Sequence, residues 1–129
     1  MQLAHPIEFL KGYFRNPKAV GSMIPSSRAL AAAVSTPYRT YAGSATVLEV
    51  GAGTGPVTRY MGTILGDVDV LDICELDPDF AEVIAQDVLT NAVFSLPVAE
   101  ERVRLIRSAV QELSFENRYD FVICGLPFT

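Results

Sequence analysis

The sequence contains no apolar run long enough to cross a bilayer, since even ALAAAV at residues 29–34 is far shorter than about 20 residues. The first residues also lack the charged start, apolar centre and small-residue cleavage site of a secretory signal. Internal repeats, low-complexity tracts and linkers are absent as well. With 129 residues, 50% of them hydrophobic, the chain is predicted to be a soluble globular protein about one domain long, located in the cytoplasm.

Cysteine is scarce, with Cys74 and Cys124 as the two residues of this type. Both lie in apolar, strand-like runs, which favours buried and reduced thiols over a disulfide framework. No metal site is predicted.

Basic residues become rare after residue 41. Residues 1–41 contain five basic residues against Glu8 alone, a net charge of +4. Residues 42–129 contain five arginines against fourteen acids, a net charge of −9. A basic N-terminal segment on an acidic body is typical of contact with an anionic surface, either phospholipid or nucleic acid. A solvated helix face explains the same pattern equally well.

Hydrophobic spacing predicts strands that alternate with helices. Strands are predicted at residues 45–50, 67–75, 102–107 and 119–124. Helices are predicted at residues 7–14, from Ser26 or Ser27 to before Pro37, at residues 56–65 and at residues 78–89, with a loop or short helix at 91–101. This alternation predicts an α/β fold with a Rossmann-like parallel sheet, in which ligands bind beyond the carboxyl ends of the strands. The chain then divides into an N-terminal helical arm, residues 1–41, and a sheet domain, residues 42–129.

The first predicted strand runs straight into the glycine-rich turn LEVGAGTG, residues 48–55. Glycine lets the backbone turn sharply and approach a ligand closely, because a Cβ atom would clash or disallow the dihedral angles. The spacing is Gly-x-Gly-x-Gly, not the Gly-x-Gly-x-x-Gly of the dinucleotide fingerprint. A tight strand-to-helix connection is the alternative to a ligand site. The candidate cofactor-binding residues here are Glu49, Gly51, Ala52, Gly53 and Gly55.

A second signal follows at the end of the next predicted strand, where Glu75 lies twenty residues beyond Gly55. An acid at this position can accept hydrogen bonds from both ribose hydroxyls of an adenosine-containing cofactor. Glu75 and its neighbour Leu76 are therefore further candidates for cofactor binding. Asp77 and Asp79 are interpreted as favourable charges at the N-terminus of the following helix.

With these motifs in this order, residues 45–128 resemble the class I S-adenosylmethionine-dependent methyltransferases. The resemblance implies S-adenosylmethionine as the cofactor, with its methionine part beside Gly51–Gly55 and its ribose on Glu75. It also implies that the turn after the third strand, Ser108-Ala109, touches adenine. The family often has an aspartate followed by a small residue there, so the backbone of Ala109 replaces a side-chain hydrogen bond in this expectation. A plain turn is the alternative for Ser108.

The stretch CGLPF at 124–128 looks like the family loop that follows the fourth strand, which reads Asn-Leu-Pro-Tyr in ribosomal RNA adenine dimethyltransferases. Gly125, Leu126, Pro127 and Phe128 are the candidate catalytic residues. The carbonyls of the first two can orient an amine and the phenyl ring can form an apolar wall, with proximity as the main catalytic lever. Gly125 takes the place of the asparagine of the RNA enzymes.

Residues 16–31 are similar to the N-terminal segment of bacterial phospholipid N-methyltransferases, which carry a Gly-Ser-x-x-Pro-Ser-Ser stretch and a Gly-Leu-Pro-aromatic loop. The first stretch is Gly21, Ser22, Pro25, Ser26 and Ser27 here. By this resemblance Gly21 and Ser22 lie over the cofactor site. A helix-capping loop is a second, compatible interpretation.

Three functions are compatible with these features. The leading one is an N-methyltransferase for the amine of a phospholipid such as phosphatidylethanolamine, with the arm on the anionic inner face of the membrane. The rival is an RNA adenine methyltransferase that uses the arm on phosphates, and the third is a cofactor-binding fragment without activity. Four of the family's usual seven strands are present, so we expect a truncation. The resemblance to the family implies a strand order of 3-2-1-4, which leaves the fourth strand at an edge, and we expect self-association through residues 119–126.

Overall fold

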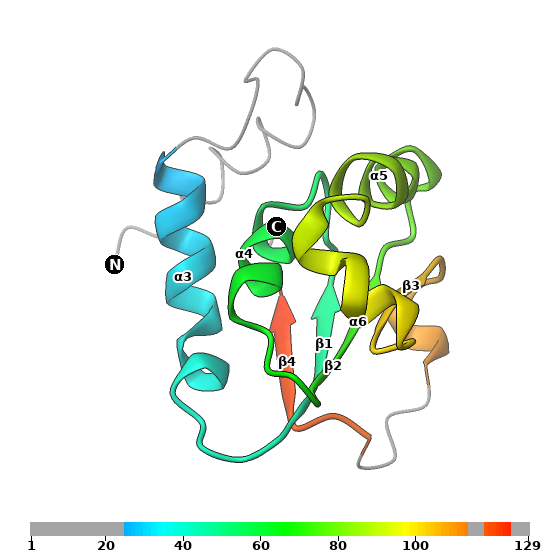
Figure 1. Ribbon diagram of the computed structural model, residues 1–129. Coiled ribbons are helices and arrows are strands. Elements are labelled where there is room, and N and C mark those ends of the chain that lie inside the picture. The colour runs from blue at the N-terminus through cyan, green and yellow to red at the C-terminus, as the bar shows by residue number, and fades with distance from the viewer. Residues whose placement is uncertain (1–24, 114–117, 125–129) are drawn as a thin grey trace.

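The computed structural model describes residues 25–113 and 118–124, and these form one parallel sheet with helices (Figure 1). The predicted helix at residues 7–14 lies outside these residues. So do Gly21 and Ser22 and the loop from Gly125 to Phe128.

Four parallel strands form the sheet, in the order β3-β2-β1-β4. They are β1 (Thr46–Val50), β2 (Val70–Cys74), β3 (Val103–Ile106) and β4 (Phe121–Cys124). The register pairs Val50 with Cys74 and with Cys124, so the carboxyl ends of β1, β2 and β4 lie level. The predicted strand order is confirmed, and β4 lies at an edge of the described sheet.

The helices follow the predicted alternation with the strands. They are α3 (Pro25–Arg39), α4 (Pro56–Ile64), α5 (Pro78–Val83) and α6 (Ser95–Ala99). A π-helical turn, Ile84–Val88, continues α5, and short 3-10 turns occupy Ala92–Phe94 and Val110–Glu112. The loop or short helix predicted at 91–101 is therefore a 3-10 turn followed by α6.

The prediction that the first described helix ends before Pro37 is wrong, because α3 continues through Pro37 to Arg39. Proline lacks the N–H that would bond to the carbonyl four residues earlier, which normally disfavours a helix interior. Tertiary contacts hold the last turn in place. The Tyr38 hydroxyl donates to Asp69 Oδ2 and accepts from the backbone N–H of Gly66, and its ring packs edge-on against Phe121.

The described residues cover the two faces of the sheet unequally. On one face, alternate strand residues such as Val47, Leu71 and Ile123 join the main hydrophobic core with buried residues of α3, α4 and the π-helical turn. Figure 1 shows α3 at the left of the strands, with α4 beside it. On the other face, Leu48, Val50 and Cys74 form a small cluster. We call these the helical face and the sparse face.

Both cysteines are free thiols, as predicted. Cys74 is buried, whereas Cys124 is half-buried, so the expectation of full burial holds for Cys74 alone. Within residues 25–113 and 118–124, no helix has the length and apolar character needed to span a membrane.

Candidate functional site

The predicted glycine turn leads from the end of β1 into α4. Gly51, Gly53 and Gly55 have φ angles of 67°, 60° and 93°, in the left-handed region that favours glycine. A Cβ atom on Gly55 would lie 2.8 Å from Val88 Cγ2, so this glycine also lets the glycine-rich turn pack closely against the π-helical turn that follows α5. The N–H of Gly51 donates to the Cys74 carbonyl at 2.9 Å, which joins the turn to the end of β2.

Glu75 is buried and holds the glycine turn directly. Its Oε1 accepts a hydrogen bond from the Gly53 N–H at 2.7 Å, and its Oε2 accepts one from the Asp77 N–H at 2.9 Å. A carboxylate has about four lone-pair sites, so two oxygens that each accept one backbone N–H can accept further donors. The structure therefore brings together the glycine turn and the acid that the sequence singled out separately.

Glu49 lies on the helical face of β1, fully buried beneath α4. Its Oε1 accepts from the Thr58 hydroxyl at 2.7 Å, while Oε2 has no hydrogen-bond partner among the described residues. Burial raises the pKa of Glu49 to about 7; the hydrogen bond from Thr58 lowers it, and the charge of Glu75 raises it further. Thr54 Oγ1, inside the glycine turn, is likewise buried and without a partner in the described part of the chain. Direct contact of Glu49 with a cofactor stays a prediction.

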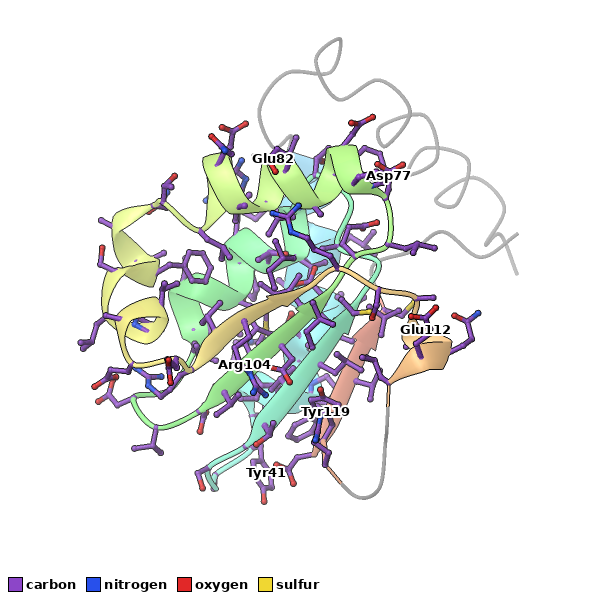
Figure 2. All side chains as sticks on the ribbon, turned by 90° about the vertical axis from the view of Figure 1, so that its right-hand side faces the viewer. Tyr41, Asp77, Glu82, Arg104, Glu112 and Tyr119 are labelled. Carbon is purple, nitrogen blue, oxygen red and sulfur yellow. The ribbon has the colours of Figure 1, made fainter. Side chains whose placement is uncertain are left out.

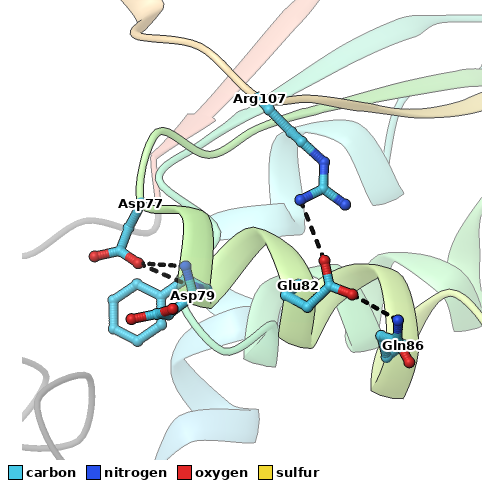
Figure 3. Close-up of polar contacts among 6 residues, drawn as sticks. Asp77, Asp79, Glu82, Gln86 and Arg107 are labelled. Carbon is cyan, nitrogen blue, oxygen red and sulfur yellow. Dashed lines mark hydrogen bonds and ion pairs between the residues drawn. The ribbon is translucent and has the colours of Figure 1, made fainter.

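The start of α5 is fixed by a side-chain cap (Figure 3). Asp77 Oδ1 accepts hydrogen bonds from the backbone N–H groups of Asp79 at 2.8 Å and Phe80 at 3.1 Å. This confirms the interpretation of Asp77 as a helix N-terminal residue. Further along α5, Glu82 forms an ion pair with Arg107 at 3.4 Å, which links the helix to the end of β3.

The turn after β3 lies beside the end of β2. The Cys74 thiol donates to the Ser108 carbonyl at 3.1 Å, and the Glu75 N–H donates to the Ile106 carbonyl at 3.0 Å. Ser108 and Ala109 are both half-buried. Burial raises the pKa of the Cys74 thiol, which favours its protonated, hydrogen-donating form. The predicted adenine-side turn is therefore attached to the strand that carries Glu75.

Leu76 and Ala52 have different surroundings, although both were predicted to bind the cofactor. Leu76 is 65% exposed and directly follows Glu75 in the chain, so it is available as an apolar surface for a ligand. Ala52 is buried in the main core, where it can offer a ligand its backbone alone.

Sequence reasoning missed Thr58, Thr54 and the thiol of Cys74 as parts of the site. Thr58 follows Glu49 by nine residues on the next helix, and no spacing rule links two such positions. Gly21, Ser22 and the loop from Gly125 to Phe128 lie outside the described residues, so their place in the site stays a prediction.

No protein-family model matches the chain. Over 121 residues, 92% of this chain, it is 32% identical to an ornithine lipid N-methyltransferase from Singulisphaera acidiphila. A protein of Methanococcus maripaludis assigned to the S-adenosyl-L-methionine-dependent methyltransferases superimposes on 92% of the chain, with a TM-score of 0.60 and 12% identity. A dimethyladenosine transferase from Plasmodium falciparum covers 81% of it, with a TM-score of 0.53 and 14% identity.

The chain has the fold of a class I S-adenosylmethionine-dependent methyltransferase. The resemblance to this family and to its lipid N-methyltransferases is thereby confirmed. The chain spans 60% of the length of the ornithine lipid enzyme, 49% of the Methanococcus protein and 33% of the Plasmodium protein.

Proposed function

We propose that this methyltransferase-fold chain binds S-adenosylmethionine at the carboxyl ends of β1 and β2 and belongs to an N-methyltransferase for the amine of a lipid head group. The observation that carries the proposal is the hydrogen bond from the Gly53 N–H to Glu75 Oε1 at 2.7 Å, which makes one site of the glycine turn and the acid. The ornithine lipid relative supports a lipid amine as the substrate. Phosphatidylethanolamine stays our predicted head group.

The residues present fit this cofactor. Glu75 has remaining lone pairs for the ribose hydroxyls, the glycine turn offers backbone groups to the methionine part, and Leu76 offers an apolar surface to adenine. The half-buried backbone at Ala109 completes this set of contacts. When bound, S-adenosylmethionine supplies a methyl group on a positively charged sulfur, with a neutral thioether as the leaving group.

The protein's own task is then to align the amine with that methyl group. Proximity and orientation supply as much as ~7–11 kcal/mol of a reaction barrier without any covalent step on the enzyme. The predicted residues for this task are Gly125 and Leu126, through their carbonyls, and Phe128, through its ring. Their role is a proposal that rests on the family resemblance.

Cofactor binding is tested by calorimetry with S-adenosylmethionine and its demethylated product. Glu75→Ala should weaken binding by ~1–3 kcal/mol, because it removes a buried hydrogen-bond acceptor. Asp79→Ala is the matched control, since it removes an acid four residues away whose backbone N–H, not its carboxylate, makes the described contact. Equal affinity of the Glu75→Ala variant and the unmodified chain would reject the placement.

The substrate is tested with radiolabelled cofactor and three acceptors: vesicles of phosphatidylethanolamine, vesicles of ornithine lipid, and ribosomal RNA. We expect label in a lipid. Label in RNA alone would establish the RNA adenine alternative, and cofactor binding with no label in any acceptor would establish an inactive cofactor-binding fragment. Location in the cytoplasm, against the inner face of the membrane, remains a prediction to be checked by cell fractionation.

A further inference from the structure

A cavity of about 400 Å³ lies between α3, α4 and the segment 88–94, and one of its lining residues, Val88, packs on its other side against Gly55 of the glycine turn. Its wall includes Arg28 of α3, Arg59 and Thr63 of α4, and Asn91. Its apolar part includes Val93 and Phe94. None of the glycine-turn residues, nor Glu75, contributes to this lining.

Two positive charges meet at this cavity without a described counter-charge. Arg102, Arg104 and Arg107 each contact a carboxylate, of Glu100, Asp72 and Glu82 respectively. By contrast, neither Arg28 nor Arg59 takes part in an ion pair with any residue in 25–113 or 118–124, and none of the lining residues there is acidic. Unpaired guanidinium groups that share one concave site favour an anionic ligand.

The apolar part of the cavity lies beside the buried phenyl ring of Phe94. Phe94 is buried, and it lies so close to α4 that a Cβ atom on Gly62 would be 2.5 Å from Phe94 Cζ. Val93 beside it is 45% exposed, so hydrocarbon surface faces the cavity next to the charged groups. The site therefore combines two cations with an apolar surface in one enclosure.

We propose that this cavity binds the phosphate group of an anionic amphiphile, with Arg28 and Arg59 on the phosphate and the exposed Val93 on the adjoining hydrocarbon. Guanidinium groups form paired hydrogen bonds with phosphate oxygens, which favours phosphate over a single-point anion. A ligand with this chemistry is either a phospholipid in a membrane or a soluble phosphate compound. The membrane is the source that uses the apolar surface as well as the charges.

The test compares two double variants with equal loss of charge. Arg28→Gln/Arg59→Gln removes both cavity cations, while Arg39→Gln/Arg118→Gln removes two arginines that do not line the cavity. Binding to phosphatidylglycerol vesicles should fall about tenfold or more for the first variant and clearly less for the second. Phosphatidylcholine vesicles measure binding without net lipid charge. Equal losses in the two variants, or no loss in the first, would overturn the proposal.

A second arm separates the two sources of phosphate. Titrations with inorganic phosphate, glycerol phosphate and dihexanoyl phosphatidylglycerol are followed by calorimetry, and we expect the short-chain lipid to bind most tightly. Equal binding of inorganic phosphate would overturn the role of Val93. The single variant Arg28→Gln, at an exposed position, should show a smaller loss in the same direction with an unchanged thermal melt. No methyl donor is needed, so these results are independent of the proposed activity.

Discussion

On each face of the sheet, the described strands bury one carboxylate, and the two carboxylates have very different hydrogen-bond partners. On the helical face, Glu49 receives one hydrogen bond, from Thr58, and its Oε2 has no partner among the described residues. On the sparse face, Asp72 receives three: Arg104 Nε donates to Oδ1 at 2.7 Å, and Arg104 Nη2 and the Tyr119 hydroxyl each donate to Oδ2 at 2.7 Å. Both carboxylates are fully buried.

The two carboxylates are equally buried and differ in their hydrogen-bond partners, so burial alone does not describe the surroundings of a buried acid. Arg104 reaches Asp72 from the surface, with its side chain 52% exposed, and Figure 2 shows it and Tyr119 on the sheet. Such a pair keeps both charges satisfied. Glu49 instead lies among core residues, where the charged form is disfavoured. The helical face therefore supplies hydrophobic stability, whereas the sparse face supplies a polar network.

The sharpest contrast between the faces is hydrophobic. Leu71→Ala, on the helical face of β2, should lower the free energy of unfolding by ~2–5 kcal/mol, because it leaves a cavity in a fully buried core. Val122, on the sparse face of β4, is 56% exposed. Val122→Ala should therefore change the free energy of unfolding by less than about 0.5 kcal/mol. Urea denaturation at neutral pH measures both. Similar losses would mean that the two faces contribute equally.

Disrupting the polar network of Asp72, Arg104 and Tyr119 should lower the free energy of unfolding by a smaller amount. Arg104→Leu leaves the buried Asp72 carboxylate with Tyr119 as its described donor and should lower the free energy of unfolding by ~1.5–3 kcal/mol. The double variant Asp72→Leu/Arg104→Leu removes the stranded charge and should recover part of that loss. Arg107→Leu, whose ion pair with Glu82 is exposed on both sides, is the control and should have almost no effect. An Arg104→Leu variant as stable as this control would contradict the proposed network.

Glu49 predicts a pH dependence of stability. Its pKa is raised from its ordinary value of 4.5 to about 7 in the folded chain, so the folded state binds a proton that the unfolded state has released. The contribution of this group to the free energy of unfolding is therefore full below about pH 4.5 and falls as the pH rises to about 7. Glu49→Gln should remove this decrease with pH and raise the free energy of unfolding at pH 8 by ~1–3 kcal/mol.

Thr58→Val is the informative partner of that experiment. The Thr58 hydrogen bond lowers the pKa of Glu49. Without it, the free energy of unfolding should continue to fall to a higher pH than in the unmodified chain. Urea melts at a series of pH values follow both variants. If the free energy of unfolding of Glu49→Gln falls with pH as it does in the unmodified chain, the pH dependence belongs to another group.

Much of the fold and part of the site could be predicted from the sequence. The strand order, the glycine turn and Glu75 follow from apolar runs, glycine spacing and the family resemblance, all of which are local patterns. The long-range partners could not be predicted: Asp72 and Tyr119 lie far apart in sequence, and so do Tyr38 and Asp69. Asp69 was placed in a strand, yet it precedes β2 and accepts a hydrogen bond from the Ala45 N–H at 2.9 Å. Such pairs depend on tertiary packing, which single-sequence spacing does not encode.

The smallest expected effect concerns self-association through β4, the strand at the edge of the described sheet. β4 pairs with β1 alone among the described strands, so we propose, as the sequence led us to expect, that a second copy of the chain pairs with its open edge. Pairing across a twofold axis near Val122 would bring two copies of any side chain at that position close together. Val122→Lys should then weaken dimerisation about two- to fivefold, because like charges placed opposite each other on paired strands repel.

Val68→Lys is the matched control for this variant, because Val68 is 71% exposed and lies outside the strands. Since Val122 is itself 56% exposed, both variants should fold with nearly unchanged stability. Sedimentation equilibrium over a range of protein concentrations measures the association. If the unmodified chain is monomeric throughout, or if both lysine variants shift the equilibrium equally, the open edge of β4 is not an association site. A loss confined to Val122→Lys would show that the edge of β4 is where the chain meets its own copy.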